Sequence, residues 1–366
     1  MTTRRYLVND LVAMEDVCNA NCSYCITGSS SFKTKHNLKF CEDKLDFHLE
    51  KLLDDENSYQ EGRQFKERLD KVTEILKETT NPFILKVSGG EILLVKGIQN
   101  FIEKQAPLYK RMQVLTNGIL LNDELLRCFV HIPNFSLQIS MDGHTLELNN
   151  YRVKSEALQN KLLKVLALCN EYKINLEINC VLTDRNIEAI YDFAQYLKQY
   201  DNVLLQPYPV RGKFREKFIP HKNQLSGLRR LLAEYDDLDK ILPPKKYLEE
   251  LVSFLELGER SKGCSIPSII YQAFDDGIIT PCPNIWYKSF GNILEAEDEV
   301  IGKMNNDPFY KITNRKQAVL EECKHCFTPW DMLDLFIKGE ISIDEISKIH
   351  LYNDPEILAY LKEMQE

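Results

Sequence analysis

The stretch Cys18-Asn19-Ala20-Asn21-Cys22-Ser23-Tyr24-Cys25 places three cysteines at close spacing, directly after the apolar run 6–14. The run predicts a strand, and the cysteines fall on the loop that follows it. Thiolates bind soft or borderline metals, so this spacing indicates an iron–sulfur cluster or zinc. Three ligands leave one iron of a four-iron cubane open, and catalytic metal sites keep such a position free. The alternatives are a zinc knuckle with a distant fourth ligand, or free thiols.

Three further motifs follow in order along the N-terminal half. They are Ser88-Gly89-Gly90-Glu91 after the apolar run 83–87, Leu115-Thr116-Asn117-Gly118 after a second strand-like run, and Ser140-Met141-Asp142-Gly143 after a third, with Arg152 shortly beyond. Paired glycines let backbone approach a ligand closely, and a carboxylate partners an ammonium group. Each fragment alone marks a plain turn. Together with the aromatic residue before Cys25, they resemble the signature of the radical S-adenosylmethionine (SAM) superfamily.

The resemblance implies a role for each motif. In that family three cysteines hold a 4Fe–4S cluster whose open iron is chelated by the amino and carboxylate groups of SAM. The positions here are Cys18, Cys22 and Cys25 for the cluster, Gly89, Gly90 and Glu91 for the SAM amine, Ser140 and Arg152 for the SAM carboxylate, and Tyr24 and Asn117 as further cofactor contacts. The implied chemistry is reductive cleavage of SAM to a 5′-deoxyadenosyl radical, which abstracts a hydrogen atom from the substrate.

Strand-like and helix-like stretches alternate over the first two thirds of the chain. The predicted strands are 6–14, 83–88, 111–116, 135–140, 174–181 and 203–207, and the predicted helices are 45–53, 65–77, 97–104, 123–130, 156–172 and 187–200. Such alternation implies parallel pairing through right-handed crossovers. The expected fold is α/β, a partial (β/α)6 TIM-like barrel over residues 1–225. Each motif follows the carboxyl end of its strand, where barrel active sites collect.

The region 226–366 carries a second cysteine pattern. After a predicted helix at 246–257, Cys264 and Cys282 flank a β-hairpin signal, Asp276-Gly277 between runs 270–274 and 278–280, and Cys323-x-x-Cys326 follows. The pattern resembles the twitch domain, a shortened SPASM domain that binds an auxiliary 4Fe–4S cluster. It predicts a small α+β domain with four thiolate ligands. A structural zinc site shows similar paired spacing and remains open.

Several residues have two possible roles. Tyr208 and Arg211 follow predicted strand six, and either contact the substrate or belong to a loop that seals the barrel. Asn179 lies near the end of predicted strand five and contacts either SAM or the substrate. Cys41 is either a hydrogen-atom donor or a partly buried spectator. The remaining cysteines, Cys128, Cys169 and Cys180, are expected to be small core residues. The C-terminal helices predicted at 331–338 and 343–361, the second broken at Pro355, either cap the barrel or cover the auxiliary cluster.

Composition restricts the class of protein. The chain has 366 residues and a net charge of −9, which argues against a broad nucleic-acid footprint. We find no apolar run long enough for a bilayer and no signal peptide, so the expected location is cytoplasmic, with no membrane partner. Eleven cysteines in such a chain indicate metal or redox use.

Two classes of function fit these observations. The first is a radical SAM oxidoreductase, with peptide modification or cross-linking favoured over dehydrogenation of a small-molecule alcohol or sugar. Its partners would be that peptide or small-molecule substrate and an external one-electron donor such as flavodoxin or ferredoxin. Only seventeen residues precede Cys18, so a fused leader-peptide-binding domain is not expected there. The second class is a non-catalytic scaffold that binds zinc through both cysteine sets.

Overall fold

The computed structural model describes residues 5–13, 18–26, 56–95, 97–212, 214–285 and 288–365. Its centre is one nine-stranded sheet in the order β6-β5-β4-β3-β2-β1-β7-β8-β9. The strands are β1 (Val8–Ala13), β2 (Ile84–Gly89), β3 (Arg111–Thr116), β4 (Phe135–Ser140), β5 (Asn175–Leu182), β6 (Val203–Pro209), β7 (Ile270–Phe274), β8 (Ile278–Thr280) and β9 (Gly291–Asn292). The first six are parallel and pair in chain order, which confirms the partial (β/α)6 barrel.

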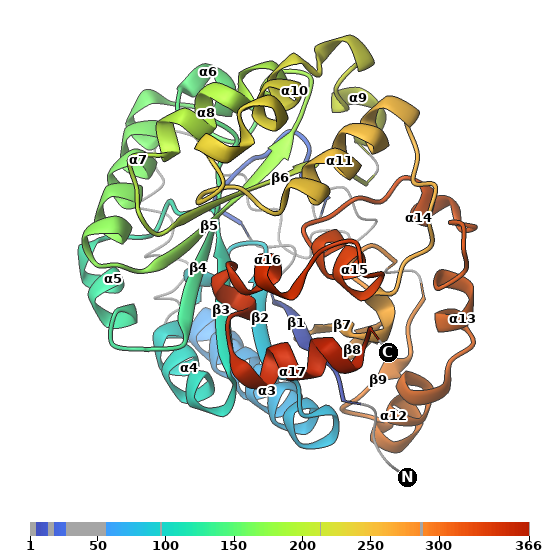
Figure 1. The fold of residues 1–366 in the computed structure, drawn as a ribbon. Helices are drawn as coiled ribbons and strands as arrows, with labels where there is room; N and C mark the ends of the chain where they lie inside the picture. The colour runs from blue at the N-terminus through green and yellow to red at the C-terminus, as the bar shows by residue number, and fades with distance from the viewer. Residues whose placement is uncertain are drawn as a thin grey trace.

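Helices of the crossovers cover the outside of this curved sheet (Figure 1). They are α3 (Glu56–Thr80), α4 (Ile98–Gln105), α5 (Asp123–Phe129), α6 (Leu146–Asn149), α7 (Glu156–Glu171), α8 (Ile190–Leu197), α9 (Arg215–Phe218), α10 (Ser226–Ala233) and α11 (Lys245–Leu257). The predicted helix 65–77 is part of α3, whereas 45–53 and Cys41 lie outside the described residues. No described helix is long and apolar enough to span a bilayer.

The hairpin after Cys264 extends the barrel sheet. Strand β7 pairs in parallel with β1, with Val8 opposite Ile270 and Val12 opposite Phe274. Strands β8 and β9 then add antiparallel. The sheet therefore runs unbroken across the predicted domain boundary at residue 225, because the hairpin supplies a seventh parallel neighbour to the barrel.

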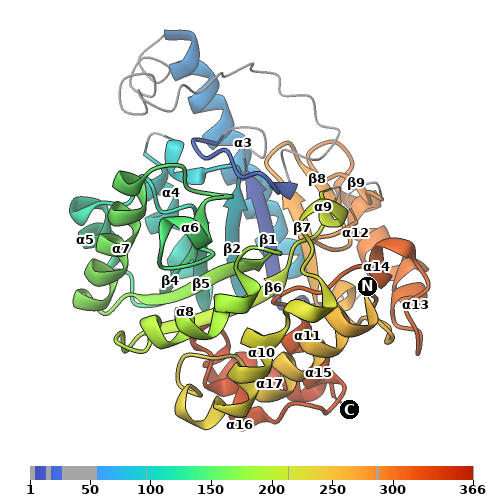
Figure 2. The same ribbon diagram turned by 90° about the horizontal axis from the view of Figure 1, so that it is seen from above.

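The C-terminal region ends in a helical layer that packs against the end of the barrel where the strands begin. Its helices are α12 (Glu297–Asn306), α13 (Phe309–Thr313), α14 (Glu321–Lys324), α15 (Asp331–Ile337), α16 (Ile343–Ser347), the 3-10 turn η7 (His350–Tyr352) and α17 (Pro355–Glu363). Arg111 at the start of β3 donates from Nε to the carbonyl of His350, at 3.1 Å. Figure 2 shows α15, α16 and α17 beside α10 and α11 at this end.

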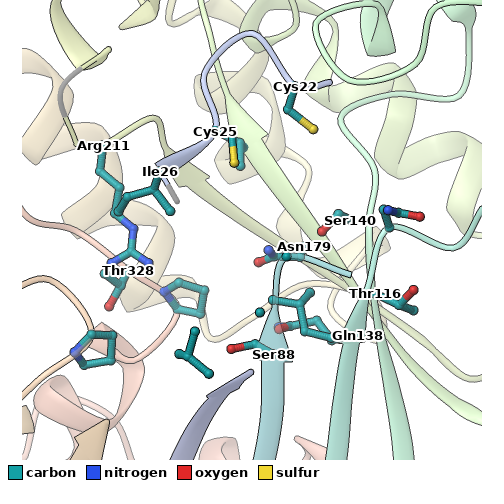
Figure 3. Close-up of a pocket in the computed structure, with 18 of the residues that line it drawn as sticks. Cys22, Cys25, Ile26, Ser88, Thr116, Gln138, Ser140, Asn179, Arg211 and Thr328 are labelled. Atoms are coloured by element: carbon teal, nitrogen blue, oxygen red, sulfur yellow. The ribbon is translucent and has the colours of Figure 1, made fainter. Parts of the chain in front are cut away.

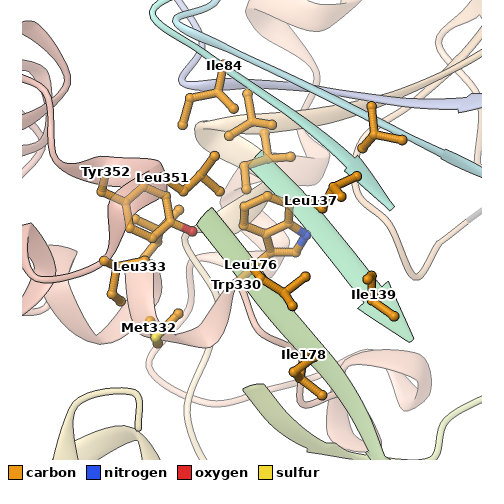
Figure 4. Packing of buried hydrophobic residues seen from close by; sticks show 14 of the residues in the cluster. Ile84, Leu137, Ile139, Leu176, Ile178, Trp330, Met332, Leu333, Leu351 and Tyr352 are labelled. Atoms are coloured by element: carbon orange, nitrogen blue, oxygen red, sulfur yellow. The ribbon is translucent and has the colours of Figure 1, made fainter. Parts of the chain in front are cut away.

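Apolar side chains join this layer to the barrel interior. Figure 4 shows Met332, Leu333, Leu351 and Tyr352 facing strand residues such as Leu137, with Trp330 among them. All of these side chains are at least nine-tenths buried. Burial of each large apolar side chain contributes about 1.5–3 kcal/mol to folding. The C-terminal helices therefore belong to the core of the molecule.

The prediction of one helix broken at Pro355 was wrong. Helix α16 ends at Ser347, a 3-10 turn follows, and Pro355 is the first residue of α17. The Asp354 carboxylate accepts hydrogen bonds from the backbone N–H groups of Glu356 and Ile357. Proline suits the first helical position because its missing N–H has no helical partner there. Pro355 therefore starts a helix here and does not interrupt one.

Candidate functional site

The three N-terminal cysteines line one large pocket at the carboxyl ends of the barrel strands. Cys18, Cys22 and Cys25 follow β1 and are half-buried. The pocket has about 1250 Å³ of empty space, open to solvent on one side. Figure 3 shows Cys22 and Cys25 across the pocket from Ser140 and Asn179. The loop thus presents its thiols to the same pocket that the other strand-end motifs line.

The chemistry of this loop fits a bound metal cluster. Burial raises the pKa of Cys18 to about 12, and burial also raises the pKa of Cys22. A thiolate forms there when a metal cation supplies the compensating charge. In an iron–sulfur cluster each thiolate binds a different iron atom, so three thiols on one loop suit three irons of a cubane.

Gly89 marks the point where two strand ends approach most closely. A Cβ atom there would lie 1.6 Å from the carbonyl oxygen of Ala13 on β1, and the φ of 158° is one that side chains rarely adopt. Only glycine fits this position. Gly89 and Gly90 both line the pocket, so they expose backbone to any ligand beside the cysteine loop.

The Glu91 carboxylate, the expected contact of the SAM amine, is bonded within the protein. It is fully buried and accepts hydrogen bonds from the Thr116 hydroxyl and the Asn117 backbone N–H, both at 2.7 Å. It also accepts from the Leu93 N–H at 3.1 Å. These three bonds hold the glycine turn against the end of β3, and the contact with the SAM amine stays a prediction.

Polar side chains at the ends of the next strands surround the same pocket. Asn117 after β3 donates from Nδ2 to Asn19 at 2.7 Å and lies 3.7 Å from the Cys18 sulfur. Asn179 on β5 donates to the Tyr208 hydroxyl at 3.0 Å. Both of these, together with Ser140, Tyr208 and Arg211, line the pocket. The structure therefore brings these sequence-predicted residues together with the cysteine loop.

Arg152 lies between the cysteine loop and a buried carboxylate that the sequence did not single out as functional. Its Nη2 donates to the Tyr24 hydroxyl at 2.9 Å, and its Nη1 lies 3.6 Å from the Cys22 sulfur. Tyr24 donates to Asp142, whose carboxylate lies 3.7 Å from Arg152 Nε. That Nε–H is buried beside Asp142 and makes no shorter contact among the described residues. Asp142 and Tyr24 therefore hold the Arg152 guanidinium in place on the wall of the pocket.

The four C-terminal cysteines line a second cavity. Cys264, Cys282, Cys323 and Cys326 come from three separate chain segments and surround about 460 Å³ of empty space. Burial raises the pKa of Cys326 to about 12 and that of Cys282 to about 11. These thiols, too, need a cation to become thiolates. The fold therefore brings the four cysteines that the sequence singled out to the wall of one cavity.

A buried ion network ties the loops of Cys264 and Cys326 together. Arg260 pairs with Asp331 and Asp334 on α15, and its backbone N–H donates to the Lys324 carbonyl at 2.6 Å. Asp334 accepts from the Ser265 N–H at 2.7 Å. These bonds are formed by side chains far apart in sequence, so nothing in the local pattern around the cysteines predicted them.

The two cavities share a wall. Arg211, Pro283, Thr328 and Trp330 line both of them, and Figure 3 places Arg211 and Thr328 at one side of the pocket. The sequence singled out Arg211 alone among these four. Cys169 and Cys180 are buried core residues, as expected, whereas Cys128 is only half-buried and does not belong to the core.

Comparisons with known proteins agree with this architecture. The model of the radical SAM superfamily matches residues 14–197. A cysteine-type anaerobic sulfatase-maturating enzyme of Clostridium perfringens is 26% identical over 338 residues, covering 84% of this chain and 83% of that protein. The subtilosin biosynthesis protein AlbA of Bacillus subtilis is 22% identical over 244 residues, covering 66% of this chain and 52% of that protein.

Solved structures show the same fold. Native anSMEcpe with bound AdoMet superimposes with a TM-score of 0.57 at 20% identity, covering 97% of each chain. Streptococcus suis SuiB bound to precursor peptide SuiA superimposes with a TM-score of 0.58 at 14% identity, covering 84% of this chain and 66% of that chain.

Fold and site together define an enzyme built on a partial α/β barrel, with a cysteine loop at the mouth of its pocket. The chain belongs to the radical SAM superfamily, whose model matches half of its length. Members of this family use SAM and a 4Fe–4S cluster.

Proposed function

We propose that this protein modifies a peptide by radical SAM chemistry, with a second cluster beside the active site. The observation that carries the proposal is the common wall, formed by Arg211, Pro283, Thr328 and Trp330, between the three-cysteine pocket and the four-cysteine cavity. A substrate in the pocket would lie between two metal sites. The chain would comprise a radical SAM core over 1–225 and an auxiliary region over 226–366.

Cys18, Cys22 and Cys25 would hold the first 4Fe–4S cluster. The backbone of Gly89 and Gly90 lines the pocket beside them and suits the SAM amine, with Glu91 fixing the turn from behind. When bound, the cluster and SAM supply a 5′-deoxyadenosyl radical that abstracts a substrate hydrogen atom. An external flavodoxin or ferredoxin would deliver the electron.

Arg152 and Ser140 would hold the SAM carboxylate. Both line the pocket, and the Arg152 guanidinium brings a positive charge to its wall. Tyr24 and Asp142 hold the guanidinium in place through the contacts described above. Asn117 would position the loop through Asn19 and the Cys18 sulfur. Asn179, Tyr208 and Arg211 would then face the substrate.

Cys264, Cys282, Cys323 and Cys326 would hold an auxiliary 4Fe–4S cluster that accepts an electron from the substrate radical. Four thiolates satisfy every iron, which leaves no iron open to SAM or substrate. The resemblance of the cysteine pattern to a twitch domain is what favours a cluster over the zinc alternative. The net reaction would be an oxidation of the substrate. The substrate would lose one hydrogen atom to the 5′-deoxyadenosyl radical, one electron to the auxiliary cluster, and one proton.

The relatives favour a peptide substrate over a sugar or other alcohol. The curated relatives include sulfatase-maturating enzymes, a sporulation killing factor maturation protein and a bacteriocin biosynthesis protein. Proteins or peptides are the substrates that these names indicate. Dehydrogenation of a small alcohol is the second candidate, because the pocket floor is polar.

The test is anaerobic reconstitution followed by reduction with dithionite in the presence of SAM. The expected products are methionine and 5′-deoxyadenosine, from a brown protein with about eight irons, the content of two cubanes. S-adenosylhomocysteine as the sole product, or a colourless zinc protein, would overturn the proposal.

A further inference from the structure

The floor of the SAM pocket is polar, although branched apolar side chains usually fill the interior of a barrel. Asp10 on β1 lies in register between Lys86 on β2 and Gln272 on β7. These three and Gln138 on β4 all line the pocket, and each is more than nine-tenths buried. Buried polar groups are almost always hydrogen-bonded, so this floor needs partners.

Three acceptors on the floor have no donor among the described residues. Asp10 accepts from Gln272 Nε2 through its Oδ2 at 3.1 Å, while its Oδ1 is unpartnered. The Oε1 atoms of Gln272 and Gln138 are also unpartnered. An unsatisfied buried acceptor costs about 1–3 kcal/mol. The floor therefore favours a ligand that brings an N–H or O–H group.

Two cationic side chains beside these acceptors have unused donors. No described carboxylate lies within ion-pair distance of Lys86, whose Nζ lies 4.6 Å from the centroid of the Trp330 ring. Arg211 Nη1 has no acceptor within the described part of the chain. The charges that act on Lys86 are Asp10, Glu177 and Arg211. The floor thus offers both acceptors and donors, which favours a ligand that carries both a donor and an acceptor.

We propose that Asp10, Lys86, Gln138 and Gln272 bind a backbone peptide group of the substrate. Asp10 Oδ1 accepts its N–H, Lys86 donates to its carbonyl oxygen, and the glutamine oxygens accept from the N–H of an adjoining residue. The Trp330 ring packs against the adjoining Cα. The inference rests on the proposed function and deepens it, because it identifies the peptide unit as the group that the pocket floor recognises.

The closing experiment detects a ligand at Trp330. The sequence has two tryptophans, Trp286 and Trp330, so 5-fluorotryptophan labelling gives two ¹⁹F signals, and a Trp286→Phe variant assigns them. The holoenzyme with SAM is titrated with three probes: N-acetyl-L-alanine methylamide, its ester analogue O-acetyl-L-lactic acid methylamide, and myo-inositol. The expected result is a saturable shift of the Trp330 signal with the diamide, about tenfold weaker binding of the ester, which lacks one N–H, and no shift with inositol.

Two variants assign the contacts. Asp10→Asn should weaken binding of the diamide about tenfold and reduce its advantage over the ester to less than about twofold, because the acceptor for that N–H is lost. Lys86→Met should weaken both probes about equally. Asp237→Asn, an exposed acidic residue in a 3-10 turn, is the matched control and should bind both probes as the wild type does.

Unchanged probe affinities in both floor variants would overturn the inference, as would a Trp330 shift with inositol and none with the diamide. The Lys86 variant keeps the test decisive if Asp10→Asn fails to fold. The shift of the Trp330 signal can be measured whether or not the enzyme cleaves SAM, so binding and catalysis are tested separately. An enzyme that binds the diamide but forms no 5′-deoxyadenosine would overturn the proposed function alone, whereas one that cleaves SAM but binds no diamide would overturn this inference alone.

Discussion

The two cysteine sites are built in opposite ways. Cys18, Cys22 and Cys25 lie within eight residues on one loop and face an open pocket, whereas the four C-terminal cysteines come from three segments around a smaller cavity. Each site has a buried arginine. Arg152 pairs with one carboxylate, Asp142, and lines the open pocket, whereas Arg260 pairs with the two carboxylates of Asp331 and Asp334. The first arginine lies where a ligand can bind, and the second joins the chain segments around its site.

Removal of the N-terminal ligands should have the largest effect. The triple change of Cys18, Cys22 and Cys25 to Ala should abolish formation of 5′-deoxyadenosine and remove about four irons, one cubane. The measurement is product analysis by liquid chromatography together with iron analysis. The matched control is Cys128→Ala, a half-buried helix cysteine that should change neither. Residual SAM cleavage at the wild-type rate would contradict the assignment of the open site.

Removal of half of the C-terminal ligands should separate SAM cleavage from substrate oxidation. Cys323→Ala/Cys326→Ala should also lose about four irons, one cubane, but keep uncoupled SAM cleavage. Substrate turnover should fall much further than cleavage, because the electron acceptor is gone. Once a peptide substrate is in hand, the ratio of product to 5′-deoxyadenosine measures this. Full turnover would show that the second site is not an acceptor, and a zinc ion at these sulfurs would exclude a cluster.

The structural arginine is expected to affect stability. Arg260→Gln leaves Asp331 and Asp334 buried without their guanidinium partner, which should reduce the free energy of unfolding by about 3–5 kcal/mol. Arg229→Gln, which breaks an exposed pair with Glu256, should change it by less than about 1 kcal/mol. Chemical denaturation of both variants provides the comparison. Equal stability of the two would show that the network does not hold the second site together.

Arg152, on the wall of the open pocket, is expected to affect the affinity for SAM and not the stability. Arg152→Gln removes a charge-assisted bond to the SAM carboxylate, worth about 1.5–3 kcal/mol, or roughly 10- to 150-fold in Kd. Equilibrium dialysis of SAM measures this, with exposed Arg127→Gln as the control. A SAM complex in which the methionine carboxylate lies far from Arg152 would refute the assignment.

The smallest effect concerns the packing of the C-terminal layer on the barrel. Burial lowers the pKa of His350, which is in η7 beside β3, to about 4. The unfolded side chain binds a proton below about pH 6.5, so folded stability is full above that pH and falls as the pH drops toward 4. Because the ring is partly exposed, we expect a loss of about 1 kcal/mol between pH 7 and 5. His350→Asn should lack this part of the pH dependence, and an unchanged profile would refute it.

The barrel was predictable because its strands and helices carry strong local patterns. Predicted strands 111–116 and 135–140 have the same bounds as β3 and β4, and the hairpin bounds at Asp276-Gly277 match β7 and β8. The pairing of β7 with β1 was not predictable, since it joins residues more than 250 positions apart. The sequence also did not reveal that the Glu91 carboxylate is buried against Thr116 and Asn117, because a motif does not show which way a side chain points.

By itself, the sequence determined the order of the strands, the cysteine loop after β1 and the glycine turn after β2, because each depends on residues close together in the chain. Only the tertiary structure decided which distant side chains meet. It placed Asp142 behind Arg152, Arg260 between two cysteine loops, and Trp330 over Lys86. The physical reason is that buried charges and aromatic rings find their partners through packing, and packing joins segments that the local pattern cannot relate.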